Sequence, residues 1–364
     1  MKSRDLPMPS KQLLSVQCLR ALAAIMVTIA HGFEEAISVF HLALPISLVA
    51  LGKGVDIFFV ISGFIIYYSS VSRGQYLLGV RRFAYLRIVR VVPLYYIFTT
   101  IYLFTAIISP KTLNKGVNGV AHIISSYLFV PYPNPEGALA PLLALGWTLN
   151  YEMQFYLLFG ILLVAVPPRY LGASVIGALV SVSVIGQIID PDPTSPLHFI
   201  TNSIIIEFGM GVALAMVYQR VGKSFANVGM ALGCFAVGIG LLLWLNTPPL
   251  PFDLSRFITA GLPALLIVGA GVLLWPADRE ERLPGILVEL GNSSYSLYLS
   301  HRFVQRPLQI AFTHFLPSAS WVGWAYAGCA VIAAISAGHV VYLLLERPLL
   351  RWFRRSDRAS RAGR

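Results

Sequence analysis

Long apolar stretches recur along the chain and are separated by short polar segments. A membrane-spanning helix needs about 20 mainly apolar residues, and the stretches have about that length. They predict ten transmembrane helices, at 15–33, 54–72, 93–109, 146–166, 171–189, 201–219, 226–245, 257–275, 287–306 and 321–345. A shorter apolar piece at 117–131 ends in a Pro-Tyr-Pro sequence and is interpreted as an interfacial helix. The pattern therefore predicts an all-α, polytopic integral membrane protein.

The polar segments between these helices carry a biased charge. Ten crossings put both termini on one side, and the segments on that side hold 20 of the 27 Lys and Arg residues, against six on the other side. Because cytoplasmic loops are rich in Lys and Arg, both termini are predicted to be cytoplasmic. The chain then divides into an N-terminal segment at 1–14, a transmembrane domain at 15–345 and a basic tail at 346–364. The tail is expected to contact membrane lipid headgroups.

Composition excludes several other classes of protein. The chain is 57% apolar and 12% charged, whereas a soluble domain carries about 25% charged residues. An ordinary soluble enzyme and a disordered chain are excluded, and the net charge of +11 is attributed to membrane orientation rather than to nucleic-acid binding. Cys18, Cys234 and Cys329 lie in apolar runs, so neither a disulfide framework nor a metal-binding pattern is predicted.

Titratable residues within the predicted spans are candidates for function, because such groups are costly in lipid. Five of them fall toward the non-cytoplasmic ends of five different helices: His31, Asp56, Glu152, Glu207 and His301. Arginines gather instead toward the cytoplasmic ends: Arg20 in the first helix, and Arg81, Arg82, Arg87 and Arg90 before the third. Each group has an ordinary alternative, in contacts with headgroups or as a topology signal. The agreement of five helices on one depth favours a shared site.

Arg20 and His31 are eleven positions apart in the first helix. This spacing brings both within about 20° of one helix face, roughly 16 Å apart along the axis. A guanidinium suits a phosphate, and a neutral imidazole can deprotonate a hydroxyl near pH 7. The pair therefore fits a long ligand with phosphates at one end and a reactive group at the other, such as acyl-coenzyme A.

Seven local motifs resemble those of membrane acyltransferase family 3, in the family's order, between about residues 13 and 350. They are the Arg20–His31 spacing and the segments 54–64, 81–95, 147–156, 207–211, 290–301 and 346–349. The segment Gly-Val-Asp-Ile-Phe-Phe-Val-Ile-Ser-Gly-Phe at 54–64 is the most specific match. Two positions depart from the family's pattern: Thr148 replaces the usual serine, and Arg302 follows His301 where a small residue or proline is commoner.

The resemblance, nearest to the exopolysaccharide O-acetyltransferase branch, implies transfer of an acyl group from acyl-CoA, usually acetyl-CoA. The acceptor would be a hydroxyl of a surface glycan or lipid-linked oligosaccharide, and the location the bacterial inner membrane. His31 would deprotonate the acceptor or carry the acyl group, with a neighbouring acid, Glu152 before Asp56, orienting the ring. The coenzyme phosphates would be bound by Arg20, Arg81, Arg82, Arg87 and Arg90. Contacts to the substrate would come from Trp147, Glu207, Tyr295, Tyr298 and His301.

Other functions stay open at this stage. A transporter or flippase could use the same polar groove, although the sequence has no internal repeat of the kind that many transporters show. A non-catalytic scaffold of a polysaccharide export complex would not need His31. An acyltransferase acting on a soluble acceptor would differ in where its product accumulates.

Overall fold

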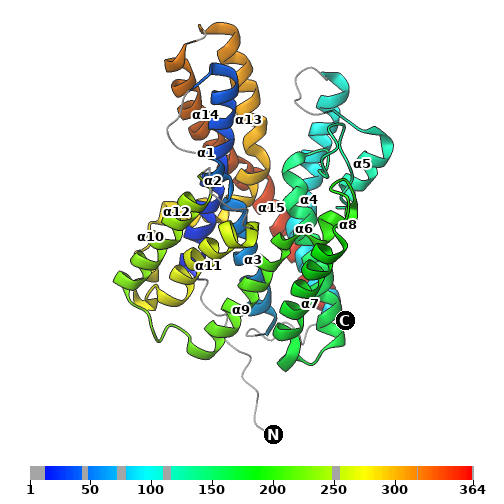
Figure 1. Ribbon diagram of the computed structural model, residues 1–364, viewed down its shortest axis with the longest axis vertical. Coiled ribbons are helices and arrows are strands. Elements are labelled where there is room, and N and C mark those ends of the chain that lie inside the picture. Colours follow the sequence, from blue (N-terminus) through cyan, green and yellow to red (C-terminus); the bar gives the residue numbers. More distant parts are fainter. Residues whose placement is uncertain are drawn as a thin grey trace.

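The computed structural model describes residues 13–42, 48–71, 79–109, 116–247, 255–317 and 319–362 (Figure 1). Several basic residues used to predict orientation lie outside the described residues: Lys2, Arg4, Lys11, Arg73, Lys111, Lys115 and Arg364. Within the described part, the regular elements are helices, apart from one isolated bridge between Pro133 and Leu139. The predicted all-α class is confirmed.

Nine helical segments in the described part of the chain are long and apolar enough to cross a membrane. Four of them are single helices: α1 (Leu14–Phe40), α4 (Gly79–Ile108), α7 (Pro168–Ile189) and α10 (Val228–Leu245). A fifth, Ala50–Val71, joins the short α2 (Val49–Gly52) to α3 (Gly54–Val71). The others combine elements: Ala144–Ala165 contains α6 (Trp147–Ala165), Pro196–Val221 contains α8 (Pro196–Thr201) and α9 (Ile206–Val221), Phe257–Leu274 contains α11 (Leu262–Gly269), and Ser320–Arg355 contains α14 (Ser320–Val341).

The tenth predicted helix, 287–306, forms two elements, α12 (Gly285–Asn292) and α13 (Ser294–Phe315). The 22 residues of α13 are enough to cross a bilayer, yet α13 is too polar to be one of the nine apolar spans. Its polar side chains, such as Ser300, His301 and Gln305, are buried, and α13 packs against α1 and α14. Because these polar groups are buried in protein and do not face lipid, they do not prevent α13 from crossing the bilayer. A tenth crossing, by α13, stays a prediction.

Helix α4 corrects the prediction of a loop over residues 73–92. The helix begins at Gly79, so Arg81, Arg82, Arg87 and Arg90 lie within it, while 72–78 lie outside the described residues. Arginine is a good helix former, and Pro93 lies inside the helix. One consequence is that the four arginines point in defined directions around a helix.

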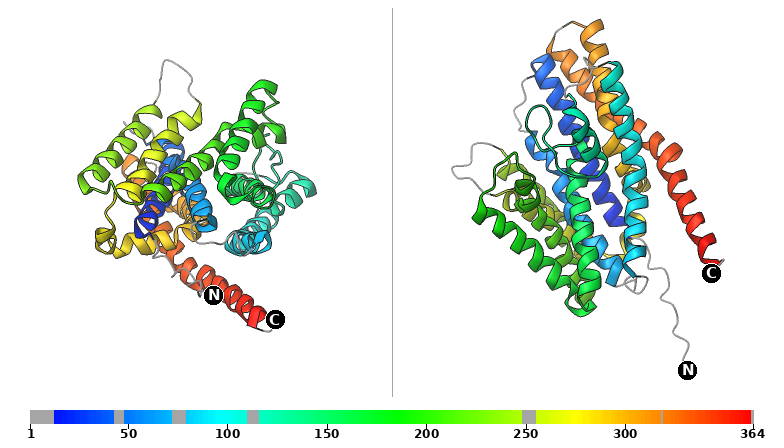
Figure 2. Two further views of the ribbon diagram at one scale, coloured as in Figure 1. Left: turned by 90° about the horizontal axis from the view of Figure 1, so that it is seen from below. Right: turned by 90° about the vertical axis from the view of Figure 1, so that its right-hand side faces the viewer.

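Helix α1 is central to the arrangement, because it packs against α3, α12, α13 and α14. Helices α13 and α14 run beside the upper part of α1 in Figure 1, whereas α4, α6 and α7 form a group on the other side of α3 and α9. The segment predicted to be interfacial contains α5 (Gly119–Tyr127), whose nine residues are too short to span a bilayer. The basic tail forms α15 (Arg347–Ala362), which runs out from the bundle in Figure 2.

Two glycines allow α3 and α9 to approach until their backbones touch. A Cβ atom at Gly63 would lie 2.0 Å from the carbonyl oxygen of Phe208, and one at Gly211 would lie 2.1 Å from that of Val60. Small residues are favoured at such contacts in membranes because they allow close packing. This contact brings α9 against the helix that carries Asp56 and Ser62.

Replacing Gly63 with alanine is expected to destabilise the protein by about 3 kcal/mol, the upper end of the usual range, since the added methyl group meets backbone that cannot rotate away. Thermal unfolding in detergent measures this loss. Gly177→Ala is the matched control, because nothing lies within 4 Å of a Cβ atom there. Equal melting temperatures for the two variants would contradict the backbone contact.

Candidate functional site

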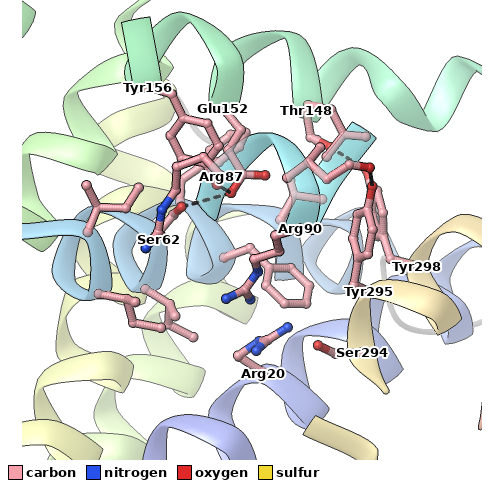
Figure 3. A pocket seen from close by; sticks show the side chains of 18 residues that line it. Arg20, Ser62, Arg87, Arg90, Thr148, Glu152, Tyr156, Ser294, Tyr295 and Tyr298 are labelled. Atoms are coloured by element: carbon pink, nitrogen blue, oxygen red, sulfur yellow. Dashed lines mark hydrogen bonds between the residues drawn. The ribbon is translucent and has the colours of Figure 1, made fainter. Parts of the chain in front are cut away.

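A cavity of about 90 Å³, here called the arginine chamber, lies among α1, α3, α4, α6 and α13. Arg20, Arg87 and Arg90 contribute its positive groups. Figure 3 shows the guanidinium groups of Arg20 and Arg90 in the same space. The other polar lining residues are Ser62, Thr148, Glu152, Tyr156, Ser294, Tyr295 and Tyr298.

Positive charge is in excess among the residues that line the arginine chamber. Its single carboxylate, Glu152, accepts hydrogen bonds from Ser62, at 3.1 Å, and from Tyr156. Arg20 Nη1 lies 3.4 Å from the neutral Gln17 Oε1, and Arg87 Nε is buried without an acceptor in the described part of the chain. Because a buried, incompletely paired guanidinium is costly, the chamber suits an anionic ligand.

A second and larger cavity of about 730 Å³, here called the histidine chamber, lies beside the C-terminal half of α1. His31 and Glu35 line it from α1, and Arg302, Phe303 and Arg306 line it from α13. Its remaining lining includes Tyr102 and Thr105 of α4, Ser109 directly after that helix, and Trp147 at the start of α6. This volume is within the usual range for small-molecule sites, about 300–1,000 Å³.

His31 is hydrogen-bonded to His301. The His31 Nδ1 and His301 Nε2 atoms are 2.8 Å apart, and the ring planes are parallel to within 5°. His301 Nδ1 lies 3.1 Å from the carbonyl oxygen of Leu297, which can only accept a hydrogen bond, so this nitrogen carries the hydrogen. In neutral rings His301 Nε2 then accepts from His31 Nδ1–H. His31 Nε2 is left with a free electron pair, which makes it a candidate base.

The hydrogen-bonded side chains of Tyr298 and Thr148 lie between the two chambers. The Tyr298 hydroxyl donates to the carbonyl oxygen of Leu145 at 2.9 Å and lies 2.9 Å from the Thr148 hydroxyl. Tyr298 and Thr148 line the arginine chamber, whereas Leu145 and Trp147 line the histidine chamber. Arg20 and His31 therefore face two adjacent cavities instead of one continuous groove.

The two acids predicted to orient His31 have other partners. Glu152 is bonded within the arginine chamber, as described above. Asp56 is fully buried, and its two oxygens accept from Arg256 Nε and Nη2 at 2.8 and 2.9 Å. The group that contacts His31 Nδ1 is instead the imidazole of His301, which was predicted as a substrate contact.

The remaining predicted residues fall in several places. Trp147 lines the histidine chamber, with the Arg256 guanidinium 5.4 Å from its ring centre. Tyr295 lines the arginine chamber and donates to the carbonyl oxygen of Val91 at 2.7 Å. Glu207 is fully buried and lines neither chamber.

The four arginines of α4 separate into two pairs. Arg87 and Arg90 line the arginine chamber, whereas Arg81 and Arg82 are not among its lining residues. Arg81 is exposed, and Arg82 lies with its guanidinium 5.4 Å from the ring centre of Tyr85. Of the predicted cluster, the structure thus brings two members to the cavity with Arg20.

Sequence reasoning missed Glu35, Arg256 and Tyr326. Glu35 follows His31 by four positions, a spacing that places both on one helix face. The sequence alone could therefore have identified Glu35 as a neighbour of His31. Arg256 and Tyr326 reach Asp56 and Glu35 from segments 200 and 291 residues away. No local spacing could have identified those two partners.

Comparisons with known proteins agree with these features. The family profile described as an acyltransferase domain matches residues 13–343. The exopolysaccharide production protein ExoZ of Rhizobium meliloti (strain 1021) is 33% identical over 319 residues, which cover 85% of this chain and 93% of that protein. No solved structure matches the chain. An all-helical bundle with nine apolar spans in its described part, matched over most of its length by the acyltransferase profile, identifies the chain as a member of acyltransferase family 3.

Proposed function

We propose that the chain is an O-acyltransferase that moves an acetyl group from acetyl-CoA to a hydroxyl of an exopolysaccharide or a related surface glycan. The observation that carries this proposal is the pair of chambers served by one helix, with a cationic cavity at Arg20 and an unprotonated imidazole nitrogen at His31. Eleven residues of α-helix separate the two groups by roughly 16 Å along the axis. This separation suits an acyl-CoA, because its phosphates and its thioester lie at opposite ends of a long arm.

The donor would approach from the arginine chamber. A cavity of about 90 Å³ is too small for a whole coenzyme but suits a narrow, extended arm. The phosphates would lie at the mouth of the chamber, where Arg20, Arg87 and Arg90 compensate their charge. For the thioester to reach His31, the arm has to pass Tyr298 and Thr148, so their hydrogen bonds would open when the donor binds.

The transfer step would use His31 Nε2 as the base. As the acceptor hydroxyl attacks the thioester carbonyl carbon, its proton passes to Nε2, and a tetrahedral oxyanion forms. Collapse of this intermediate breaks the carbon–sulfur bond, and the imidazolium returns the proton to the leaving thiolate. His301 would hold the His31 ring in the required tautomer, as a hydrogen-bond partner does in other histidine-dependent sites. A route in which Nε2 first carries the acyl group is the alternative.

The orientation and acceptor belong to the same proposal. With both termini in the bacterial cytoplasm, the arginine chamber would face the cytoplasmic pool of acetyl-CoA, and the histidine chamber would face the opposite side of the inner membrane. A glycan or lipid-linked oligosaccharide would meet the acyl group there. The name of the relative ExoZ, which refers to exopolysaccharide production, supports a polysaccharide acceptor.

The test is transfer of label from radiolabelled acetyl-CoA into exopolysaccharide, using membranes that contain or lack the protein. Label that depends on the protein and is released as acetate by mild alkali supports an O-acetyl product. Label from another acyl-CoA alone would change the donor. Absence of label, together with transport of glycan across vesicles, would replace the proposal with a transporter.

His301→Ala is expected to lower kcat roughly 10- to 100-fold, a share of the 10²–10⁴ that a positioned base contributes, while KM for acetyl-CoA changes little. His301→Gln should retain more activity, because its side-chain oxygen can accept from His31 Nδ1–H. Steady-state kinetics in detergent provides the comparison. Equal loss in both variants at unchanged melting temperature would show that acceptance of this hydrogen bond is not what His301 provides.

A further inference from the structure

Arg302 makes a specific contact beside the candidate base. Arg302 follows His301 on α13, lines the histidine chamber, and donates from Nη1 to Glu35 Oε1 at 2.9 Å. Glu35 lies one helical turn beyond His31 and lines the same chamber. An ion pair is therefore adjacent to the candidate base.

Burial and a further hydrogen bond hold the Glu35–Arg302 ion pair in place. Glu35 is 6% exposed, and its second oxygen, Oε2, accepts from the Tyr326 hydroxyl of α14. The Arg302 side chain is 34% exposed and lines the histidine chamber, so it remains accessible to a ligand there. A carboxylate oxygen can accept more than one hydrogen bond and a guanidinium has five donors. Both groups can therefore bind a ligand without breaking their mutual bond.

The rest of the chamber has the chemistry that a sugar ring needs. Trp147, Phe303 and Tyr102 provide aromatic surface, while Thr105 and Ser109 add hydroxyl groups. An apolar wall with a few placed polar groups is typical of small-molecule sites. Vicinal hydroxyls of a sugar donate well to a carboxylate and accept well from a guanidinium, because hydrogen bonds to ionised groups are the stronger ones.

We infer that the Glu35–Arg302 pair is the acceptor-recognition site, at which a sugar hydroxyl next to the reacting one binds Glu35 and Arg302 while the reacting hydroxyl lies at His31 Nε2. This inference rests on the proposed acyl transfer and names the residues that select its acceptor. The pair acts on binding of the glycan and leaves binding of the acyl-CoA unchanged, since neither residue lines the arginine chamber.

The experiment compares Glu35→Gln and Arg302→Gln with Tyr326→Phe. Tyr326→Phe also removes a hydrogen bond from Glu35, but Tyr326 does not line the histidine chamber, so it reports on the structural role of the carboxylate alone. Two quantities are measured on purified full-length protein: KM for de-O-acetylated exopolysaccharide from the producing bacterium, and Kd for acetyl-CoA.

Glu35→Gln and Arg302→Gln are expected to raise the acceptor KM by roughly tenfold or more, the usual effect of losing a hydrogen bond to a charged group. Kd for acetyl-CoA should stay within twofold of wild type, since neither residue lines the arginine chamber, and Tyr326→Phe should keep the wild-type KM. An unchanged acceptor KM in both glutamine variants, or an equal rise in Tyr326→Phe, overturns the inference while transfer by the wild type still stands. Failure of wild-type transfer would instead reject the proposed function.

Discussion

His31→Ala is expected to lower the rate of acyl transfer by at least about 100-fold, because a positioned general base contributes 10²–10⁴ in rate and alanine has no proton acceptor. The protein should still insert and fold, since a small apolar side chain is cheaper in a membrane than an imidazole. Transfer of labelled acetyl groups from acetyl-CoA to polysaccharide is the measurement, at matched expression in membranes.

His314→Ala is the matched control, since His314 is an exposed histidine near the end of α13 and lines neither chamber. It should transfer acyl groups at the wild-type rate. If His31→Ala kept wild-type activity, another group would carry the chemistry and the role assigned to the His31–His301 pair would be wrong.

The double variant Arg87→Gln, Arg90→Gln is expected to weaken acetyl-CoA binding by roughly 100-fold or more. Each arginine offers hydrogen bonds to a charged ligand worth about 1.5–3 kcal/mol, and both line the arginine chamber. The loss should be seen as a higher Kd in equilibrium binding, with a smaller effect on the rate at saturating donor.

Arg81→Gln, Arg82→Gln provides the comparison within the same helix, with the same change in net charge. The sequence predicted that this pair also binds the coenzyme, whereas neither residue lines the chamber, so its effect on Kd should be several-fold smaller. Equal losses in the two double variants would show that binding follows the total charge of α4 rather than the chamber.

The helical class and the nine apolar spans found among the described residues could be predicted because they depend on local apolar length, which is a property of the sequence alone. The boundaries of polar segments were harder. Residues 79–92 were predicted as loop because four arginines interrupt the apolar pattern, yet they continue α4. The span predicted at 287–306 joined α12 to the first part of α13, whereas the structure ends one helix at Asn292 and begins the next at Ser294.

The placement of Arg20 and His31 along one helix was determined by the sequence, because eleven residues of α-helix set both their separation and their common face. The tertiary structure decided what each residue meets. It paired His31 with His301, bonded Asp56 to Arg256, and placed Tyr298 between the two chambers. The reason is physical: helical periodicity specifies the neighbours within one helix, whereas the partner across an interface depends on how helices pack, as the glycine contact between α3 and α9 illustrates.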